Sequence, residues 1–150
     1  MTITFEAACD TDVAALLALC RAAGSAPGSA WNDAYPDAEV LREDITRGAL
    51  YHIVARGIAG VPDGRVGLIA MGALGEMDDL PWDASEPDAR TAARPCEIAR
   101  FGLAPAFQRR GIGAAALAAA LAHCAERGFD EARILVVREN AHVMRMYTRA

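Results

Sequence analysis

Seven consecutive residues combine glycine and arginine where a loop turns into an alanine-rich segment: Gln108-Arg109-Arg110-Gly111-Ile112-Gly113-Ala114. Glycine lets a ligand approach the backbone closely, and the first N–H groups of a helix have no acceptor within that helix. With the helix dipole, these donors suit a diphosphate, and Arg109 and Arg110 add charge where its oxygens would lie. A tight turn that only lets the helix pack on a sheet is the alternative. We expect a pyrophosphate site.

The glycine spacing also matches a second kind of phosphate motif. Gly111, Gly113 and Ala116 spell the GxGxxA fingerprint of dinucleotide-binding proteins. That fingerprint follows its strand directly, whereas Ala104 to Arg110 intervene here, and too little chain follows to build a doubly wound second half. The sequence therefore favours another diphosphate ligand.

Composition narrows the classes of partner. A formal net charge of −5 argues against nucleic acid, because phosphate contacts need clustered basic residues. All 15 basic residues are Arg, and a chain without Lys has neither a Walker phosphate loop nor a Schiff-base mechanism.

Cysteine and histidine show no metal-ligand spacing. The four cysteines form no CxxC pair and the three histidines form no HExxH motif, so we expect no metal. No signal-like segment follows Met1, and no apolar run is long enough to span a membrane. We expect a cytoplasmic protein with reduced thiols and no membrane partner.

Hydrophobic periodicity and turn residues predict four helices and five strands. The predicted strands are Ile3–Ala8, Leu50–Arg56, Arg65–Leu74, Cys96–Leu103 and Ala132–Arg138, and the predicted helices are a segment from Val13 to Gly24, Asp37–Arg47, Gly111–Arg127 and a last one from about Asn140. The second helix should pair Glu43 with Arg47. Pro62, Asp63 and Gly64 indicate an antiparallel hairpin, and the strand-helix-strand order around the glycine turn implies a parallel pair. The polar insertion Glu76–Pro95 is interpreted as a flap.

The residues from Cys96 to Tyr147, about a third of the chain, resemble the GCN5-related N-acetyltransferase (GNAT) superfamily. Its signature Q/R-x-x-G-x-G/A is matched by Gln108, Gly111 and Gly113. Leu103-Ala104-Pro105 is similar to the apolar residue, spacer and Pro that end the preceding strand.

Two further runs add to this resemblance. Asn140 to Tyr147 looks like the family's Asn followed by a helix that carries a Tyr. Trp31 to Pro36, with Asp44-Ile45 and Gly48 beyond it, resembles one bacterial branch of the superfamily.

The resemblance implies an α/β (α+β) fold: a mixed, mostly antiparallel sheet flanked by helices, whose parallel fourth and fifth strands splay apart. Acetyl-coenzyme A would lie in the gap. Its pyrophosphate would bind backbone N–H groups from Arg109 to Ala114, and its pantetheine would pair with the strand near Leu103. Asn140 would hold pantetheine, cap the last helix, or do both.

Two residues are candidates for proton transfer. An amine attacks a thioester only as the neutral base, and the departing thiolate needs a proton. Glu97 lies 14 residues before Gly111, a spacing similar to that of the family's general base, and its alternatives are a carboxylate at the edge of the pocket or a partner for Arg100. Tyr147, seven residues past Asn140, matches the family's general acid; a packing Tyr is the alternative. We interpret Cys96 as a structural thiol.

The acceptor side carries weaker signals. Trp31, Tyr35 and Trp82 either wall a pocket or anchor loops to the core. The acidic flap either is a solvated loop or attracts a cationic amine; its acidic residues are Asp78, Asp79, Asp83, Glu86 and Asp88.

The chain stops at Ala150, where the family would continue with Gly-Phe and two more strands. Either a C-terminal part is missing from residues 1–150, or the single domain completes its sheet by other means, such as a second copy in a homodimer. We expect an acetyl-coenzyme A-dependent N-acetyltransferase acting on an unidentified amine of a small molecule or peptide. The alternative is a non-catalytic module that binds coenzyme A for sensing or assembly.

Overall fold

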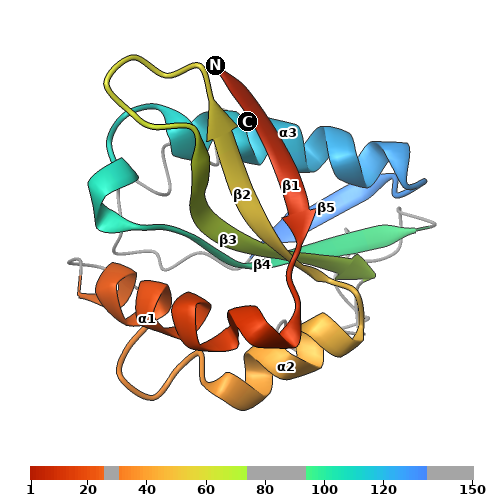
Figure 1. Cartoon of the computed structure of the whole chain (residues 1–150). Coiled ribbons are helices and arrows are strands. Elements are labelled where there is room, and N and C mark those ends of the chain that lie inside the picture. Colours follow the sequence, from red (N-terminus) through yellow and green to blue (C-terminus); the bar gives the residue numbers. More distant parts are fainter. Residues whose placement is uncertain (26–30, 74–93, 135–150) are drawn as a thin grey trace.

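A five-stranded sheet in the order β1-β2-β3-β4-β5 runs through the computed structural model, which describes residues 1–25, 31–73 and 94–134 (Figure 1). Its strands are β1 Thr2–Ala7, β2 Leu50–Arg56, β3 Gly64–Ala73, β4 Pro95–Leu103 and β5 Glu131–Ile134. The first four strands pair antiparallel, and β5 pairs with β4 in parallel. This confirms the predicted mixed, mostly antiparallel sheet.

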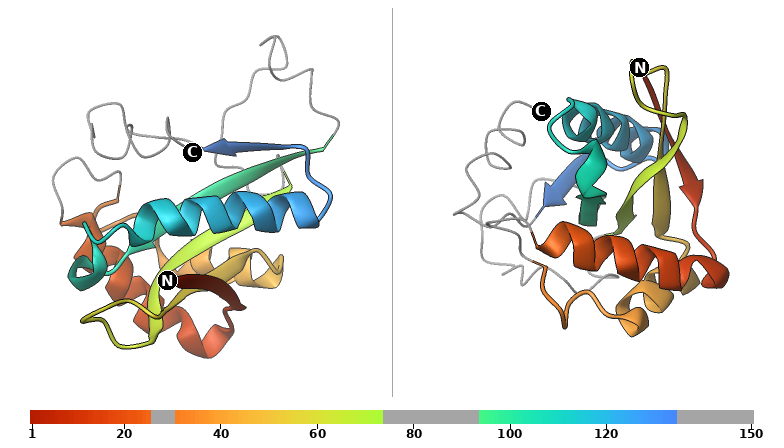
Figure 2. Two further views of the ribbon diagram at one scale, coloured as in Figure 1. Left: turned by 90° about the horizontal axis from the view of Figure 1, so that it is seen from above. Right: turned by 60° about the vertical axis from the view of Figure 1, so that its left-hand side comes forward.

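Helices cover both faces of the sheet. Figure 2 shows α3 (Ile112–Glu126) on one side and α1 (Val13–Gly24) with α2 (Ala38–Thr46) on the other. α1 and α3 bury apolar stripes at helical spacing, as Leu16, Cys20 and Ala23 do in α1, whereas α2 buries Leu41 together with Asp44. The side chain of Asp37 caps α2 by accepting a hydrogen bond from the Val40 N–H at 2.9 Å.

The sheet separates two apolar clusters, one under each helical layer. The α3 cluster includes Ile98 and Leu103 of β4, and the α1/α2 cluster includes Leu41 of α2 with Leu68 of β3. Side chains alternate between the two faces of a strand. Consequently Cys96 and Ile98 face α3, whereas Glu97 and Ala99 face α1 and α2.

Strand β4 carries a bulge just beyond its pairing with β5. Leu68 and Ala70 of β3 pair with Gly102 and Ala99, so two β4 residues, Arg100 and Phe101, lie opposite Ile69 alone. Arg100 has φ 45°, a left-handed conformation that is uncommon outside glycine. The bulge turns Arg100 toward the α1/α2 layer, while Leu103 returns to the α3 cluster.

One predicted surface contact is wrong. Arg47 lies near Asp44, with 3.9 Å between Nη1 and Oδ1, instead of pairing with Glu43. The expected flap and last helix, and the end of the fifth strand, lie outside the described residues. Within the described ranges, no helix is long and apolar enough to cross a membrane.

Candidate functional site

The turn from β4 into α3 adopts the backbone that its glycine predicts. A short 3₁₀ turn, η3 (Pro105–Phe107), follows β4. Arg109 (φ 59°) and Gly111 (φ 78°) then take left-handed conformations, and α3 begins at Ile112. The first helical hydrogen bond of α3 runs from the Ala115 N–H to the Gly111 carbonyl, at 3.2 Å.

Three N–H groups therefore precede the first helical hydrogen bond: those of Ile112, Gly113 and Ala114. Among residues 1–25, 31–73 and 94–134 no backbone acceptor is found for them. A Cβ at Gly111 would meet no heavy atom within 4 Å, so the space before the helix is open. Unsatisfied donors at the positive end of a helix dipole, with open space before them, fit a diphosphate.

The neighbouring side chains of the turn have distinct tasks. The side-chain Nε2 of Gln108 donates to the Leu103 carbonyl at 3.0 Å, which ties the turn to the end of β4. Arg110 donates from Nε to the Ala106 carbonyl at 3.2 Å, and both Arg109 and Arg110 are exposed. We interpret Gln108 as a brace for the turn and the two arginines as the charged groups available to phosphate oxygens.

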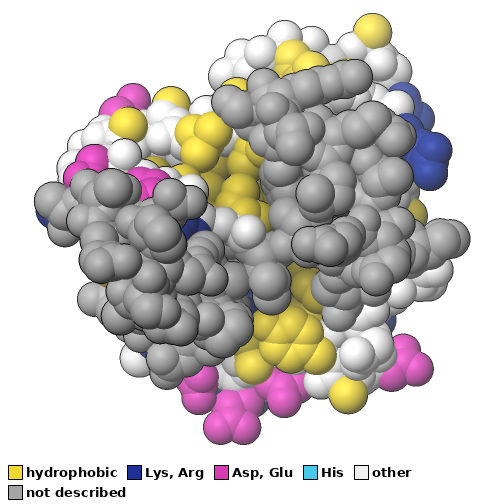
Figure 3. All heavy atoms as spheres, turned by 180° about the vertical axis from the view of Figure 1, so that it is seen from behind, with side chains coloured by type: hydrophobic (Ala, Val, Ile, Leu, Met, Phe, Trp, Pro, Cys, Tyr) yellow, Lys and Arg dark blue, Asp and Glu magenta, His cyan; other side chains and the backbone are white. Residues whose placement is uncertain are grey.

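Figure 3 shows how charge is distributed on the face opposite to that of Figure 1. Basic side chains form a group at the right-hand edge of this view, and acidic side chains lie at the upper left and along the bottom. Side chains of both charges are therefore exposed on this face.

Strand β5 leaves part of the β4 edge open within the described residues. The two strands pair from Pro95 to Ile98 on β4, whereas Ala99, Gly102 and Leu103 pair with β3 but with no described residue of β5. An open strand edge offers backbone groups to an amide-containing ligand such as pantetheine.

Glu97 lies on the paired part of β4, facing the α1/α2 layer. It is 1% exposed, and its cross-strand neighbours are Gly72 on β3 and Arg133 on β5. Arg133 is also buried, and its Nε donates to Glu131 Oε1 at 2.9 Å. The candidate base is therefore a buried carboxyl beside a buried arginine in the sheet.

Arg100 forms a buried ion pair with Asp44 of α2. Its Nε donates to Oδ2 at 2.6 Å and its Nη2 to Oδ1 at 2.8 Å, and the two side chains are 1% and 0% exposed. The Nη1 group donates to the Tyr35 hydroxyl at 3.0 Å. The sequence offers Glu97 as a candidate partner of Arg100 and does not point to Asp44. The available signal was the position of Asp44, three residues after Leu41 on the buried face of α2.

Trp31 and Tyr35 both contact β4, as the anchoring interpretation predicted. A Cβ on Gly102 would lie 2.4 Å from the Trp31 ring, so the indole covers this glycine directly. The loop is further shaped by Asn32, whose Oδ1 accepts hydrogen bonds from the N–H groups of Ala34 (2.7 Å) and Tyr35 (3.0 Å). Trp82 and the acidic flap lie outside the described residues.

The remaining candidates from the sequence separate into buried and undescribed residues. Cys96 is fully buried, and its hydrogen bond with Cys124 together with burial raises the pKa of the Cys96 thiol. A thiol held protonated in this way is a poor nucleophile, which agrees with a structural role. Asn140 and Tyr147 lie outside the described residues. Within the described part, no group of three or more metal-ligating side chains occurs.

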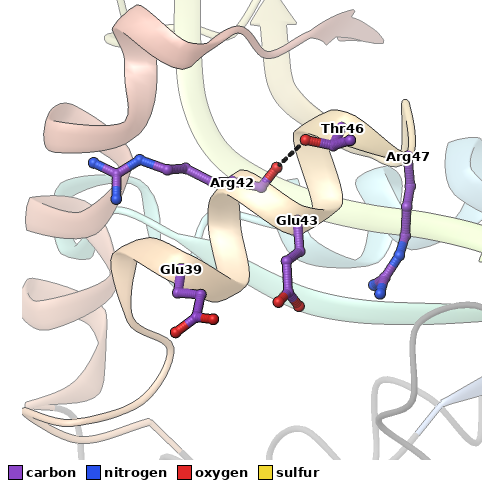
Figure 4. A pocket seen from close by; sticks show the side chains of 5 residues that line it. All are labelled: Glu39, Arg42, Glu43, Thr46 and Arg47. Atoms are coloured by element: carbon purple, nitrogen blue, oxygen red, sulfur yellow. Dashed lines mark hydrogen bonds between the residues drawn. The ribbon is translucent and has the colours of Figure 1, made fainter.

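A surface hollow lies away from this turn, on the outer side of α2 (Figure 4). Four α2 residues and the residue that follows the helix line it: Glu39, Arg42, Glu43, Thr46 and Arg47. The Thr46 hydroxyl donates to the Arg42 carbonyl at 2.9 Å, and the other four side chains extend away from the helix (Figure 4). Since one helix alone forms the hollow, we assign it no part in the chemistry.

Comparison with known proteins gives consistent matches. The profile described as "Acetyltransferase (GNAT) family" matches residues 16–150. A GCN5-related N-acetyltransferase from Ralstonia eutropha JMP134 is similar in structure, with a TM-score of 0.64 and 18% identity over 99% of this chain and 90% of that one. A ribosomal-protein-alanine N-acetyltransferase from Brucella melitensis has a TM-score of 0.63 and 21% identity, over 99% and 82%.

A third similar structure contains acetyl-coenzyme A. It is a predicted acetyltransferase from Clostridium acetobutylicum, with a TM-score of 0.58 and 14% identity over 97% of this chain and 88% of that one. At these identities the structures show a shared fold. A comparison with curated proteins finds no match.

Proposed function

Because the chain belongs to the GNAT acetyltransferase family, we propose that it transfers an acetyl group from acetyl-coenzyme A to a primary amine of a small molecule or peptide. The proposal includes direct attack by the amine while both substrates are bound. The observation that carries it is the turn before α3: three N–H donors without a backbone acceptor among the described residues, two exposed arginines and open space lie next to the part of β4 that has no described β5 partner.

Each part of the donor substrate has residues that fit it. The N–H groups from Arg109 to Ala114 would bind the pyrophosphate, and the β4 backbone near Leu103 would pair with pantetheine, with Asn140 as a further contact. The structure with bound acetyl-coenzyme A that shares this fold supports the same choice of ligand.

The proposed chemistry requires two proton movements. The amine nitrogen attacks the thioester carbonyl carbon and loses a proton, which Glu97 would accept. The C–S bond then breaks, and Tyr147 would give its phenolic proton to the departing thiolate. The product is an amide, and coenzyme A leaves as a free thiol.

The burial of Glu97 bears on the alternative function, a module that binds coenzyme A without catalysis. A carboxyl that is 1% exposed reaches a substrate proton only if the bound amine, or a water molecule, comes to it. A module that only binds coenzyme A needs neither Glu97 nor Tyr147. The two functions therefore differ in what these side chains contribute.

The test is release of free thiol from acetyl-coenzyme A with a panel of amines. We expect turnover by the wild type and a loss of about 10²- to 10⁴-fold in kcat for Glu97→Gln and for Tyr147→Phe, the range typical of a lost general base or acid. Matched controls are Glu126→Gln at the exposed end of α3 and Tyr51→Phe on β2, which should keep wild-type rates.

Two results would contradict the proposal. Tight binding of coenzyme A without turnover of any amine would favour the binding module. Turnover that survives both substitutions would leave transfer standing and remove Glu97 and Tyr147 from the mechanism.

A further inference from the structure

The Tyr35 hydroxyl accepts a hydrogen bond, but its own hydrogen has no acceptor among the described residues. Its oxygen accepts a hydrogen bond from Arg100 Nη1 at 3.0 Å, so the hydroxyl hydrogen is available to donate. Among residues 1–25, 31–73 and 94–134 no acceptor for that hydrogen is found. Tyr35 is 38% exposed and therefore lies partly at the surface.

Tyr51 shows what a completed arrangement looks like in the same chain. Its hydroxyl accepts from Arg127 Nη1 at 2.6 Å and donates to the Gly48 carbonyl at 3.2 Å. Both tyrosines accept a hydrogen bond from an arginine, but only Tyr51 also has a described acceptor for its own hydrogen. Unlike Tyr51, Tyr35 therefore presents a hydroxyl hydrogen that can be donated to a ligand.

The arginine that holds Tyr35 is itself fixed. Asp44 accepts hydrogen bonds from Nε and Nη2 along one edge of the Arg100 guanidinium and neutralises its charge, and both side chains are buried. A planar guanidinium held by two hydrogen bonds has one orientation, so its remaining donor points in a fixed direction. Accepting a hydrogen bond from a cation also polarises the phenol and makes its O–H a stronger donor.

The position of Tyr35 relates it to the proposed reaction. Arg100 lies at the β4 bulge, two residues after Ile98, the last β4 residue that pairs with β5. Tyr35 thus approaches, on the α1/α2 face, the part of β4 that has no β5 partner among the described residues, and this is also the face of Glu97. The phosphate turn belongs to α3 on the opposite face. A substrate that enters beside Glu97 would meet the Tyr35 loop rather than α3.

We propose that the Tyr35 hydroxyl binds the amine substrate by donating a hydrogen bond to an oxygen atom near its reacting nitrogen. This inference rests on the proposed function. It names the acceptor as an oxygen-bearing amine, such as an amino-acid amide or a peptide N-terminus, in preference to a plain alkylamine. Arg100 and Asp44 act through Tyr35 as positioning residues.

The experiment compares paired amines on the full chain loaded with coenzyme A. Calorimetry measures the Kd of several amino-acid amides and of the alkylamines that lack their carboxamide, for instance leucinamide against 3-methylbutylamine. We expect the wild type to bind the amides about 3- to 10-fold more tightly, the size of one hydrogen bond. Tyr35→Phe should abolish that preference, and Tyr51→Phe should retain it.

The ratio of the two Kd values within one variant separates recognition from folding, because a general loss of folded protein weakens both ligands alike. A wild type that binds amides no better than alkylamines, or binds neither, overturns the inference, as does a Tyr35→Phe variant that keeps the preference. Thiol release is scored separately. Turnover without a Tyr35-dependent preference rejects the inference alone, whereas a Tyr35-dependent preference without turnover rejects the proposed acetyl transfer alone.

Discussion

Asp44 carries a negative charge into the protein interior, where Arg100 neutralises it. Removing two charges from water costs several kcal/mol per ion, and their attraction roughly offsets that cost only when the geometry is good. Two hydrogen bonds of 2.6 and 2.8 Å meet that condition. The pair therefore contributes little net stability as a unit, but either partner left alone is strongly unfavourable.

Asp44→Ala should lower the free energy of unfolding by about 3 to 5 kcal/mol, because it leaves the Arg100 charge buried without its carboxylate. Urea unfolding followed by circular dichroism measures this change. Asp37→Ala is the matched control: it removes the exposed cap of the same helix and should cost about 1 kcal/mol. Equal losses for the two variants would show that the buried pair has no special role.

At the scale of elements, the sequence predicted most of the sheet and all three described long helices. Periodicity and turn residues located the β2–β3 hairpin and both ends of α3 to within one or two residues. The bulge in β4 was not predicted. The bulge depends on how β4 aligns with Ile69 of β3, a strand more than 20 residues earlier in the chain. Its left-handed position is also occupied by an arginine and not by the glycine that would have marked it in the sequence.

The candidate site likewise has a local part that the sequence predicts and a long-range part that it does not. The turn before α3 is local, so its glycine spacing sufficed to predict a left-handed Gly111 and free N–H donors. The contact of Arg100 with Asp44 and Tyr35 joins residues 56 and 65 positions apart. No periodicity reports such a contact, because it arises only when α2 packs on the sheet.

The turn before α3 can be tested as a unit by placing a carboxylate in its open space. Gly111→Glu should weaken coenzyme A binding at least about tenfold, since the new charge would face the pyrophosphate beside the N–H donors. Calorimetry with coenzyme A gives the affinity. Gly48→Glu is a close control, because Gly48 also has a positive φ (69°) and open space around its Cβ position, but lies at the end of α2.

The Gly48→Glu variant reports any loss of affinity that comes only from backbone strain at a left-handed position. If Gly111→Glu binds coenzyme A as tightly as Gly48→Glu does, the ligand does not occupy the turn before α3.

At the scale of the whole molecule, the Asp12 carboxylate links the start of the helical layer to two strands of the sheet. Asp12 Oδ2 lies 3.0 Å from His52 Nε2 of β2 and accepts from the Cys9 N–H at 2.9 Å, while Arg65 of β3 approaches Oδ1 at 3.4 Å. The contact with His52 and the hydrogen bonds from Cys9 hold the pKa of Asp12 well below its usual value.

A carboxyl whose pKa is lower in the folded state stabilises the protein above its unfolded pKa of about 3.9, and this contribution is lost as pH falls toward the folded pKa. We therefore expect the free energy of unfolding to decline below about pH 4, with a smaller decline in Asp12→Asn. Urea unfolding at several pH values between neutral and strongly acidic measures both slopes. Exposed Asp33→Asn is the control; an Asp12→Asn slope equal to that of wild type would reject the link.

The β4 bulge has a consequence for how the chain tolerates changes in length. Arg100 and Phe101 together lie opposite one partner residue, so the bulge absorbs an extra residue while Ala99 and Gly102 stay aligned with β3. Deleting either residue would make the strand regular and leave Gly102 under the Trp31 ring and Leu103 in the α3 cluster. The same deletion would remove Arg100 or turn it away from Asp44, because only the bulge lets Arg100 share the face of Ala99. The extra residue in β4 thus serves the buried contacts of Arg100, and a chain one residue shorter would keep the strand end but lose that ion pair.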